Sequence, residues 1–186
     1  MSAEFFQRPV HDVAPELIGA ELYVDGVGGV IVDVEAYAPE DAASHAFGNR
    51  RTARNGSMFL PGGHAYVYRS HGIHWCLNFV CEEEGRGAGI LLRALEPRRG
   101  LDEMRERRGG PADLLLCSGP GRLCQALGVT NAHDGLALDR PPFDFRPRSS
   151  PAAVVTGVRI GLSKAADLPW RYGLAGSRYV SRAFAV

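Results

Sequence analysis

Two carboxylates and a phenol, Asp33, Glu35 and Tyr37, alternate with apolar residues in one Val-rich stretch. In a strand, this alternation places all three on one face. A carboxylate in an otherwise buried strand has to be paired or functional, because burying an unpaired charge is costly. Arg93 is the only charge of the apolar run 90–95 and is the natural partner. Two interpretations of Glu35 stay open: a structural ion pair, or a carboxylate that Arg93 keeps ionised for general-base catalysis.

Two aromatic, alternating runs, residues 64–69 and 73–80, flank the tripeptide 70–72 and predict a β-hairpin with His71 at its tip. Core packing is the default explanation for each ring in the runs. The tip is different, because a ring between serine and glycine and next to Arg69 does not fit a core. An exposed ring on a protruding loop suits a wedge between stacked bases.

A zinc site is the competing interpretation of this region, because His71, His74, Cys76 and Cys81 lie close together. No CxxC or HExxH motif accompanies them, and strand alternation puts Cys81 on the face opposite His74 and Cys76. The four cysteines of the chain fit apolar packing in a reduced compartment better than a disulfide framework. We therefore expect no metal or organic cofactor, and a zinc hydrolase stays open as an alternative.

The charge of the chain is balanced overall but unevenly distributed. Lys and Arg number 21 and Asp and Glu number 21, yet residues 1–41 hold nine acids and one base. No carboxylate occurs between Asp41 and Glu82, where four arginines and four histidines occur. A basic surface for nucleic acid is therefore compatible with a net charge of zero. Lys164 is the only lysine, so phosphate contacts would fall mainly to arginine.

The length of 186 residues predicts one domain, residues 1–186. The order of the elements predicts an α+β fold with a mixed, mainly antiparallel sheet. No apolar run is long enough to cross a membrane and no signal peptide is apparent, so we expect a cytoplasmic, nucleoid-associated protein. The predicted strands are 20–24, 27–37, 64–69, 73–80, 88–95, 154–162 and 178–184, the helices 12–19, 101–108 and 121–127, and the long loops 40–63 and 139–151.

A general base, stacking rings, a wedge and arginines are the parts that an enzyme acting on a nucleobase needs. Ordered blocks of this sequence resemble the alkyladenine DNA glycosylases, also called methylpurine or 3-methyladenine DNA glycosylase II. The resemblance runs from about Val10 to the C-terminus. The matching blocks are 34–37, 39–45, 52–59, 63–68 with 76–78, 91–97, 116–127, 159–161 and 178–181.

This resemblance implies a curved sheet with surrounding short helices and a DNA-inserting β-hairpin. It also implies a monofunctional, monomeric N-glycosylase of bacterial type, whose partner is double-stranded DNA containing a damaged purine. The enzyme would flip out and excise 3-methyladenine and 7-methylguanine in base excision repair. Hypoxanthine and etheno-adenine are further candidate substrates. A Schiff-base lyase step is not expected, because Lys164 lies far from Glu35 in the sequence. A non-catalytic damaged-DNA binding module on the same scaffold is the alternative.

The resemblance also assigns roles to individual residues. Glu35 is similar to the base that activates water, with Arg93 and the carbonyl of Ile160 holding that water. The residues that resemble the purine-binding set are Tyr37 and Tyr68 as the sandwich, His45 beside them, and Asn78 near the purine N2 position. The residues that resemble DNA contacts are His71, Ile73, His74, Arg50, Thr52, Arg54 and Arg122.

Two departures from the family pattern affect these assignments. His71 stands where vertebrate members have a tyrosine wedge, which predicts weaker or pH-sensitive intercalation. The segment between Tyr37 and His45 is one residue shorter than in the vertebrate form, which affects the placement of His45.

Overall fold

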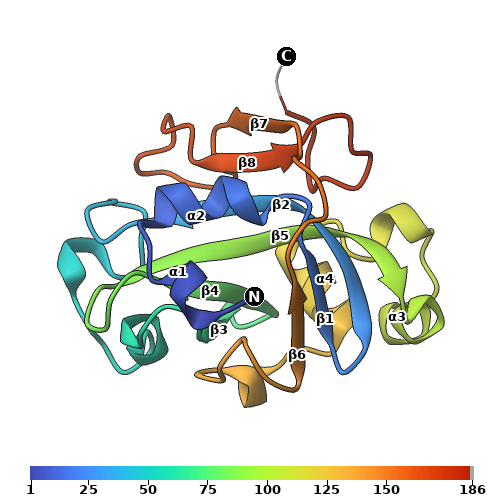
Figure 1. Ribbon diagram of the computed structural model, residues 1–186, viewed down its shortest axis with the longest axis horizontal. Coiled ribbons are helices and arrows are strands. Elements are labelled where there is room, and N and C mark those ends of the chain that lie inside the picture. Colours follow the sequence, from blue (N-terminus) through green and yellow to red (C-terminus); the bar gives the residue numbers. More distant parts are fainter. Residues whose placement is uncertain (185–186) are drawn as a thin grey trace.

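Eight strands form one curved antiparallel sheet in the computed structural model, which describes residues 1–184 (Figure 1). Six strands follow the order β3-β4-β5-β2-β1-β6, and β8 pairs with both β2 and β7. Every strand pair among these residues is antiparallel, so the expected α+β class holds while the expected mixture of directions does not. The strands are β1 Glu21–Val24, β2 Val27–Tyr37, β3 Ala65–Ser70, β4 His74–Cys81, β5 Ala88–Arg99, β6 Phe143–Arg146, β7 Val154–Gly157 and β8 Arg171–Leu174.

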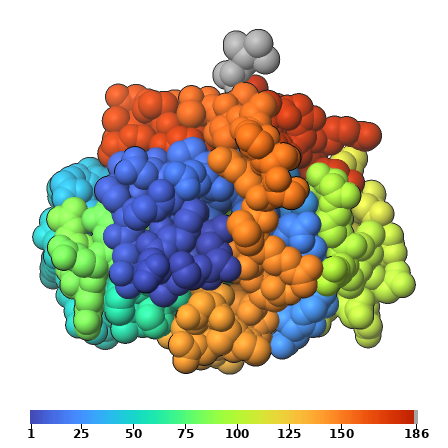
Figure 2. Space-filling view, in the orientation of Figure 1, coloured from blue at the N-terminus to red at the C-terminus, as the bar shows by residue number. Residues whose placement is uncertain are grey.

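Short helices surround this sheet. The α-helices are α1 Ala3–Phe6, α2 Val10–Leu17, α3 Leu101–Arg108 and α4 Pro120–Leu127, and the 3-10 helices are Phe47–Asn49, Gly56–Phe59, Asp113–Leu115 and Asn131–His133. Helix α2 packs on β2 and β5, and α4 packs on β4 and β5. Figure 2 shows the N-terminal helices in blue on one face, beside a later segment in orange. Arg148 of that segment donates a hydrogen bond to the carbonyl of Ile18.

Strand β2 is central to the sheet and is the strand that carries Asp33 and Glu35. One edge pairs with β5 along nearly its whole length. The other edge is shared, because residues 27–30 pair with β1 and residues 33–35 pair with β8. Irregular register near Asp33 accompanies this change of partner. Both carboxylates are thus placed where strands cover them on either side.

Several predicted elements are confirmed and others are wrong. Strands β1, β2, β3 and β4 and helix α3 match their predicted ranges within one residue. Helix α2 begins at Val10 rather than Asp12, because the carbonyl of Pro9 accepts the first helical hydrogen bonds. Strand β5 continues beyond its predicted end at residue 95 to Arg99.

The C-terminal third differs most from the prediction. A short strand, β6, lies in the expected loop 139–151, where Phe143 and Phe145 alternate inward between polar residues. Strand β7 ends at Gly157 instead of residue 162, because Arg159 turns into the interior. The predicted strand 178–184 is wrong: β8, at 171–174, takes the place beside β2 instead.

Among the described residues, no helix combines the length and the apolar character needed to cross a bilayer.

Candidate active site

The side chain of Glu35 is fully buried and both of its oxygens have partners. Oε1 accepts a hydrogen bond from the backbone N–H of Ile160 at 2.7 Å and lies 3.2 Å from Nη1 of Arg93. Oε2 accepts a hydrogen bond from the hydroxyl of Tyr37 at 2.8 Å. The predicted contact between Glu35 and Arg93 is therefore confirmed. Ile160 meets the carboxylate through its N–H, so the predicted role of its carbonyl stays a prediction.

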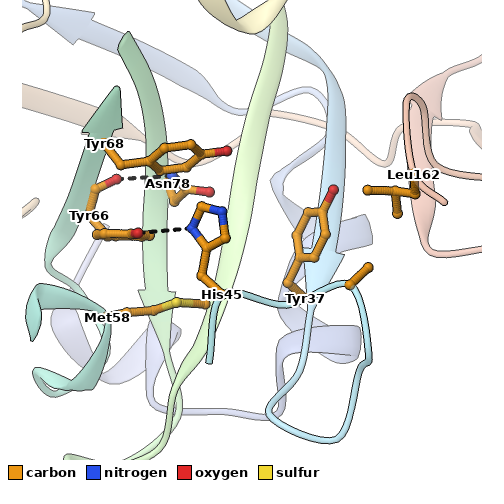
Figure 3. Close-up of a pocket in the computed structure, with 8 residues that line it drawn as sticks. Tyr37, His45, Met58, Tyr66, Tyr68, Asn78 and Leu162 are labelled. Atoms are coloured by element: carbon orange, nitrogen blue, oxygen red, sulfur yellow. Dashed lines mark hydrogen bonds between the residues drawn. The ribbon is translucent and has the colours of Figure 1, made fainter. Parts of the chain in front are cut away.

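Tyr37 also lines a pocket of about 90 Å³ (Figure 3). In that view the ring of Tyr37 faces His45, with Tyr66 and Tyr68 behind the histidine and Leu162 beyond Tyr37. The predicted purine-binding residues thus do come together. The complete lining is Tyr37, Ala43, His45, Met58, Tyr66, Tyr68, Asn78 and Leu162.

Contacts among the polar and aromatic residues hold one wall of this pocket. The rings of Tyr66 and Tyr68 stack with centroids 5.4 Å apart, and His45 lies edge-on to Tyr68 at 4.5 Å. Nδ1 of His45 and the hydroxyl of Tyr66 are 3.0 Å apart, and the amide of Asn78 donates to the carbonyl of Tyr66. This wall is therefore arranged before any ligand enters.

The pocket walls carry no formal charge at neutral pH. His45 keeps contact with solvent, yet desolvation by the surrounding rings, together with the nearby Arg54 charge, lowers its pKa, which favours the neutral imidazole. Burial raises the pKa of Tyr37 and Tyr68 well above the ordinary tyrosine value, with the charge of Glu35 adding to the effect at Tyr37. Both phenols keep their protons. The pocket suits a flat aromatic ligand better than an anion.

The ring of Tyr37 also contacts a buried arginine, Arg159, which the sequence pattern alone did not assign to the site. The guanidinium of Arg159 lies 4.6 Å from the ring centroid of Tyr37 and 5.1 Å from that of Trp170. Its charge is matched by Asp41, which it meets through both Nη atoms. Ile160 follows directly in the chain, so this ion pair also fixes the N–H that binds Glu35. The matching block 159–161 contains Arg159, but the resemblance assigned a role only to Ile160.

The sequence of the chain matches the family model described as methylpurine-DNA glycosylase over residues 4–178. The chain belongs to the methylpurine-DNA glycosylase family. The family comprises DNA glycosylases that act in the repair of alkylated purines.

Bacterial relatives are similar over nearly their full length. A protein of Nitrobacter winogradskyi is 59% identical over 184 residues, covering 99% of this chain and 88% of its own. A protein of Rhodopseudomonas palustris strain BisB18 is 60% identical over 185 residues, covering 100% and 92%. One of Nitrosospira multiformis is 60% identical over 173 residues, covering 93% and 89%. Each is named "Putative 3-methyladenine DNA glycosylase".

In this glycosylase-family chain the predicted wedge lies at the tip of the β3–β4 hairpin. His71 and Gly72 both have positive φ angles, 49° and 69°, which close the turn. Ile73 is 65% exposed, and His74 is exposed beside it. A Cβ on Gly121 would lie 2.8 Å from Cβ of His74, so glycine lets helix α4 approach the hairpin closely. The role of this hairpin in DNA insertion stays a prediction.

The predicted phosphate contacts all lie on the surface, in two places. Arg50, Thr52 and Arg54 are exposed in the 40–63 loop, which Asn55 orders by binding the backbone N–H of Thr52 at 2.6 Å. Arg54 extends from that loop to the carbonyl of Arg69 on the hairpin. Arg122 is exposed in the first turn of α4.

The residues of the zinc alternative do not converge. His71 and His74 are exposed at the hairpin, whereas Cys76 and Cys81 are buried in the sheet. Within residues 1–184, no three His, Cys, Asp or Glu side chains come together as a metal site requires.

Proposed function

We propose that this protein hydrolyses the N-glycosidic bond between deoxyribose and an alkylated purine, 3-methyladenine first, in double-stranded DNA during base excision repair. The observation that carries the proposal is the buried carboxylate of Glu35, which Arg93 and the N–H of Ile160 hold and which binds the hydroxyl of Tyr37, one of the uncharged rings that line the pocket. Membership of the methylpurine-DNA glycosylase family and the names of the relatives support the same chemistry.

The pocket would receive the flipped purine with Tyr37 on one side and His45 and Tyr68 on the other. Alkylation at N3 or N7 makes the purine cationic, so the leaving group is good before the enzyme acts. A cationic ring over a tyrosine face gains about 0.5–2 kcal/mol.

The hydrogen bonds of Glu35 indicate where the attacking water would bind. A carboxylate oxygen accepts about two hydrogen bonds. Oε1 already meets Ile160 and Arg93, whereas within residues 1–184 the partner of Oε2 is the hydroxyl of Tyr37 alone. The remaining acceptor capacity of Oε2 would take a hydrogen bond from the attacking water.

The proposed hydrolysis uses water and the side chain of Glu35 and needs no cofactor. Water adds its oxygen to C1′ of the sugar, Glu35 takes the proton of that water, and the C1′–N bond breaks with its electron pair leaving on the purine. The carboxylate acts as the base does in inverting glycosidases. The carbonyl of Ile160 would be a second acceptor for the same water.

A Schiff-base step is not part of this proposal, although Lys164 is nearer to the pocket than its sequence position suggested. It lines a neighbouring cavity that shares Ala43 and Leu162 with the base pocket. Lys164 is exposed, whereas lysines that form Schiff bases are generally desolvated. Borohydride treatment during turnover is therefore expected to trap no covalent protein–DNA product, and a trapped product that disappears in Lys164→Met would overturn this part.

The decisive experiment is single-turnover excision from a duplex that contains one 3-methyladenine. Glu35→Gln is expected to lower the rate at saturating enzyme about 10²- to 10⁴-fold while lesion-DNA affinity stays near that of the wild type. Glu40→Gln is the matched control, because Glu40 lies on the surface in a pair with Arg86. Retained excision by Glu35→Gln would remove this residue as the base, and a wild-type protein that binds but never excises would favour the binding-module alternative.

The same assay extends to the proposed wider substrate range of 7-methylguanine, hypoxanthine and etheno-adenine. Asn78 lines the pocket with its amide hydrogen-bonded to the carbonyl of Tyr66. By its resemblance to the family residue, Asn78 would lie near the purine N2 position and disfavour purines that carry an N2 amino group. Binding should also weaken with added salt, through a modest number of Arg–phosphate contacts that include Arg50, Arg54 and Arg122. Salt-independent affinity would contradict the proposed DNA surface.

A further inference from the structure

The hydroxyl of Ser181 connects two buried ion pairs. One pair joins Glu35 to Arg93, and the other joins Asp33 to Arg171, whose Nε and Nη2 lie 2.9 and 2.8 Å from the carboxylate oxygens. Oγ of Ser181 lies 3.1 Å from Nε of Arg93 and 2.6 Å from Oδ2 of Asp33. The backbone N–H of Ser181 donates to the same Oδ2 at 2.9 Å.

The chemistry of the partners fixes the direction of these hydrogen bonds. An ionised carboxylate only accepts and a guanidinium only donates, whereas a hydroxyl does both. Ser181 therefore gives its single proton to Asp33 and presents a lone pair to the Nε–H of Arg93. The bidentate contact with Arg171 matches the charge of Asp33, which leaves that carboxylate as a fixed anchor for the serine.

This arrangement determines where Arg93 places its remaining donors. The guanidinium is planar and rigid, so fixing Nε also fixes the direction of Nη1, which lies 3.2 Å from Oε1 of Glu35. Strand β5 holds the backbone of Arg93, but its long side chain needs a second point of attachment. Ser181 supplies that point from a segment without regular strand structure, 88 residues further along the chain.

We propose that Ser181 is a positioning residue for the general base: it holds Arg93 so that its guanidinium orients the Glu35 carboxylate toward the attacking water. The inference rests on the proposed function, because it assigns Ser181 to the same reaction. Within residues 1–184, Ser181 neither lines the pocket nor makes a hydrogen bond with Glu35, so its effect passes through Arg93.

The test is Ser181→Ala in the single-turnover assay, measured at saturating enzyme together with lesion-DNA affinity and Tm. The excision rate is expected to fall on the order of 10- to 100-fold, the size of effect that loss of an orienting partner or a small misplacement produces. Affinity should stay within about twofold, because the pocket and the DNA surface are unchanged. Ser181→Thr keeps a hydroxyl and is expected to restore most of the rate.

Ser177→Ala is the matched control. Ser177 lies in the same segment, and its hydroxyl accepts a hydrogen bond from the backbone N–H of Tyr179 without contact to either ion pair. If Ser181→Ala excises at the wild-type rate, or loses rate only in proportion to affinity or Tm, the inference is wrong. If Ser181→Ala does not fold, Ser181→Thr decides alone. A folded threonine variant that excises far more slowly than Ser177→Ala would contradict a role for the hydroxyl. An inactive wild-type protein would overturn the proposed function and this inference with it.

Discussion

Asp41→Asn tests how much the buried Asp41–Arg159 pair stabilises the protein and its pocket. Both side chains are 0% exposed, and Arg159 also donates hydrogen bonds to the carbonyls of Ala36 and Ala165. Asparagine removes the negative charge and can present only one acceptor oxygen, with its NH₂ facing the donors of the guanidinium. The variant therefore leaves a buried positive charge without a counter-charge.

The expected loss of stability follows from that burial. Removing one partner of a buried ion pair costs about 3–5 kcal/mol, because the remaining charge cannot be solvated. Total stabilities of domains are about 5–15 kcal/mol, so the loss is a large fraction of the whole. For a chain of this length, each kcal/mol corresponds to about 2–4 °C, which predicts a fall in Tm of about 6–20 °C.

Urea unfolding and thermal denaturation at neutral pH measure the effect, with Glu40→Gln as the control. The side chain of Glu40 is 67% exposed beside Arg86, and removal of such a surface charge should change stability by about 0.5 kcal/mol or less. A loss below about 1 kcal/mol in Asp41→Asn would refute the reasoning, because the charge of Arg159 would then be balanced without its carboxylate.

Three further predictions follow from burial and exposure. Burial lowers the pKa of His11, so the unfolded chain binds the extra proton first and stability is lost as the pH falls through the ordinary value of 6.5. His11→Phe keeps a ring against Trp170, so the free energy of unfolding of this variant should fall less than that of the wild type between about pH 7.5 and about pH 5. An equal fall in both proteins would contradict this prediction. Burial raises the pKa of every cysteine, that of Cys117 to about 12, so a thiol reagent at mild alkaline pH should label all four only after unfolding; fast native labelling would contradict their burial. In lesion-binding assays His71→Ala should weaken affinity and His71→Tyr should strengthen it, because a larger ring stacks better between bases, and equal affinities would argue against insertion of this tip.

Local sequence was sufficient for the elements that carry the site. Alternation predicted β2 and the β3–β4 hairpin, and the charged run from Leu101 to Arg108 predicted α3. The lone charge of Arg93 in an apolar strand predicted its contact with Glu35, since two buried opposite charges have to meet. The last strand was misplaced, because residues 171–174 are a strand through pairing with β2 and β7 and carry only a weak pattern of their own.

The sequence by itself determined which residues could do the chemistry: a carboxylate and a phenol two positions apart on a strand, with rings and arginines in the following blocks. Only the tertiary structure decided which groups surround and hold that carboxylate. Its N–H donor at Ile160 and the serine that holds Arg93 come from segments 125 and 146 positions away, and neither lies in a regular strand. The physical reason is that periodicity specifies the face on which a side chain lies, whereas the partners of a buried charge depend on the path by which distant segments return to it.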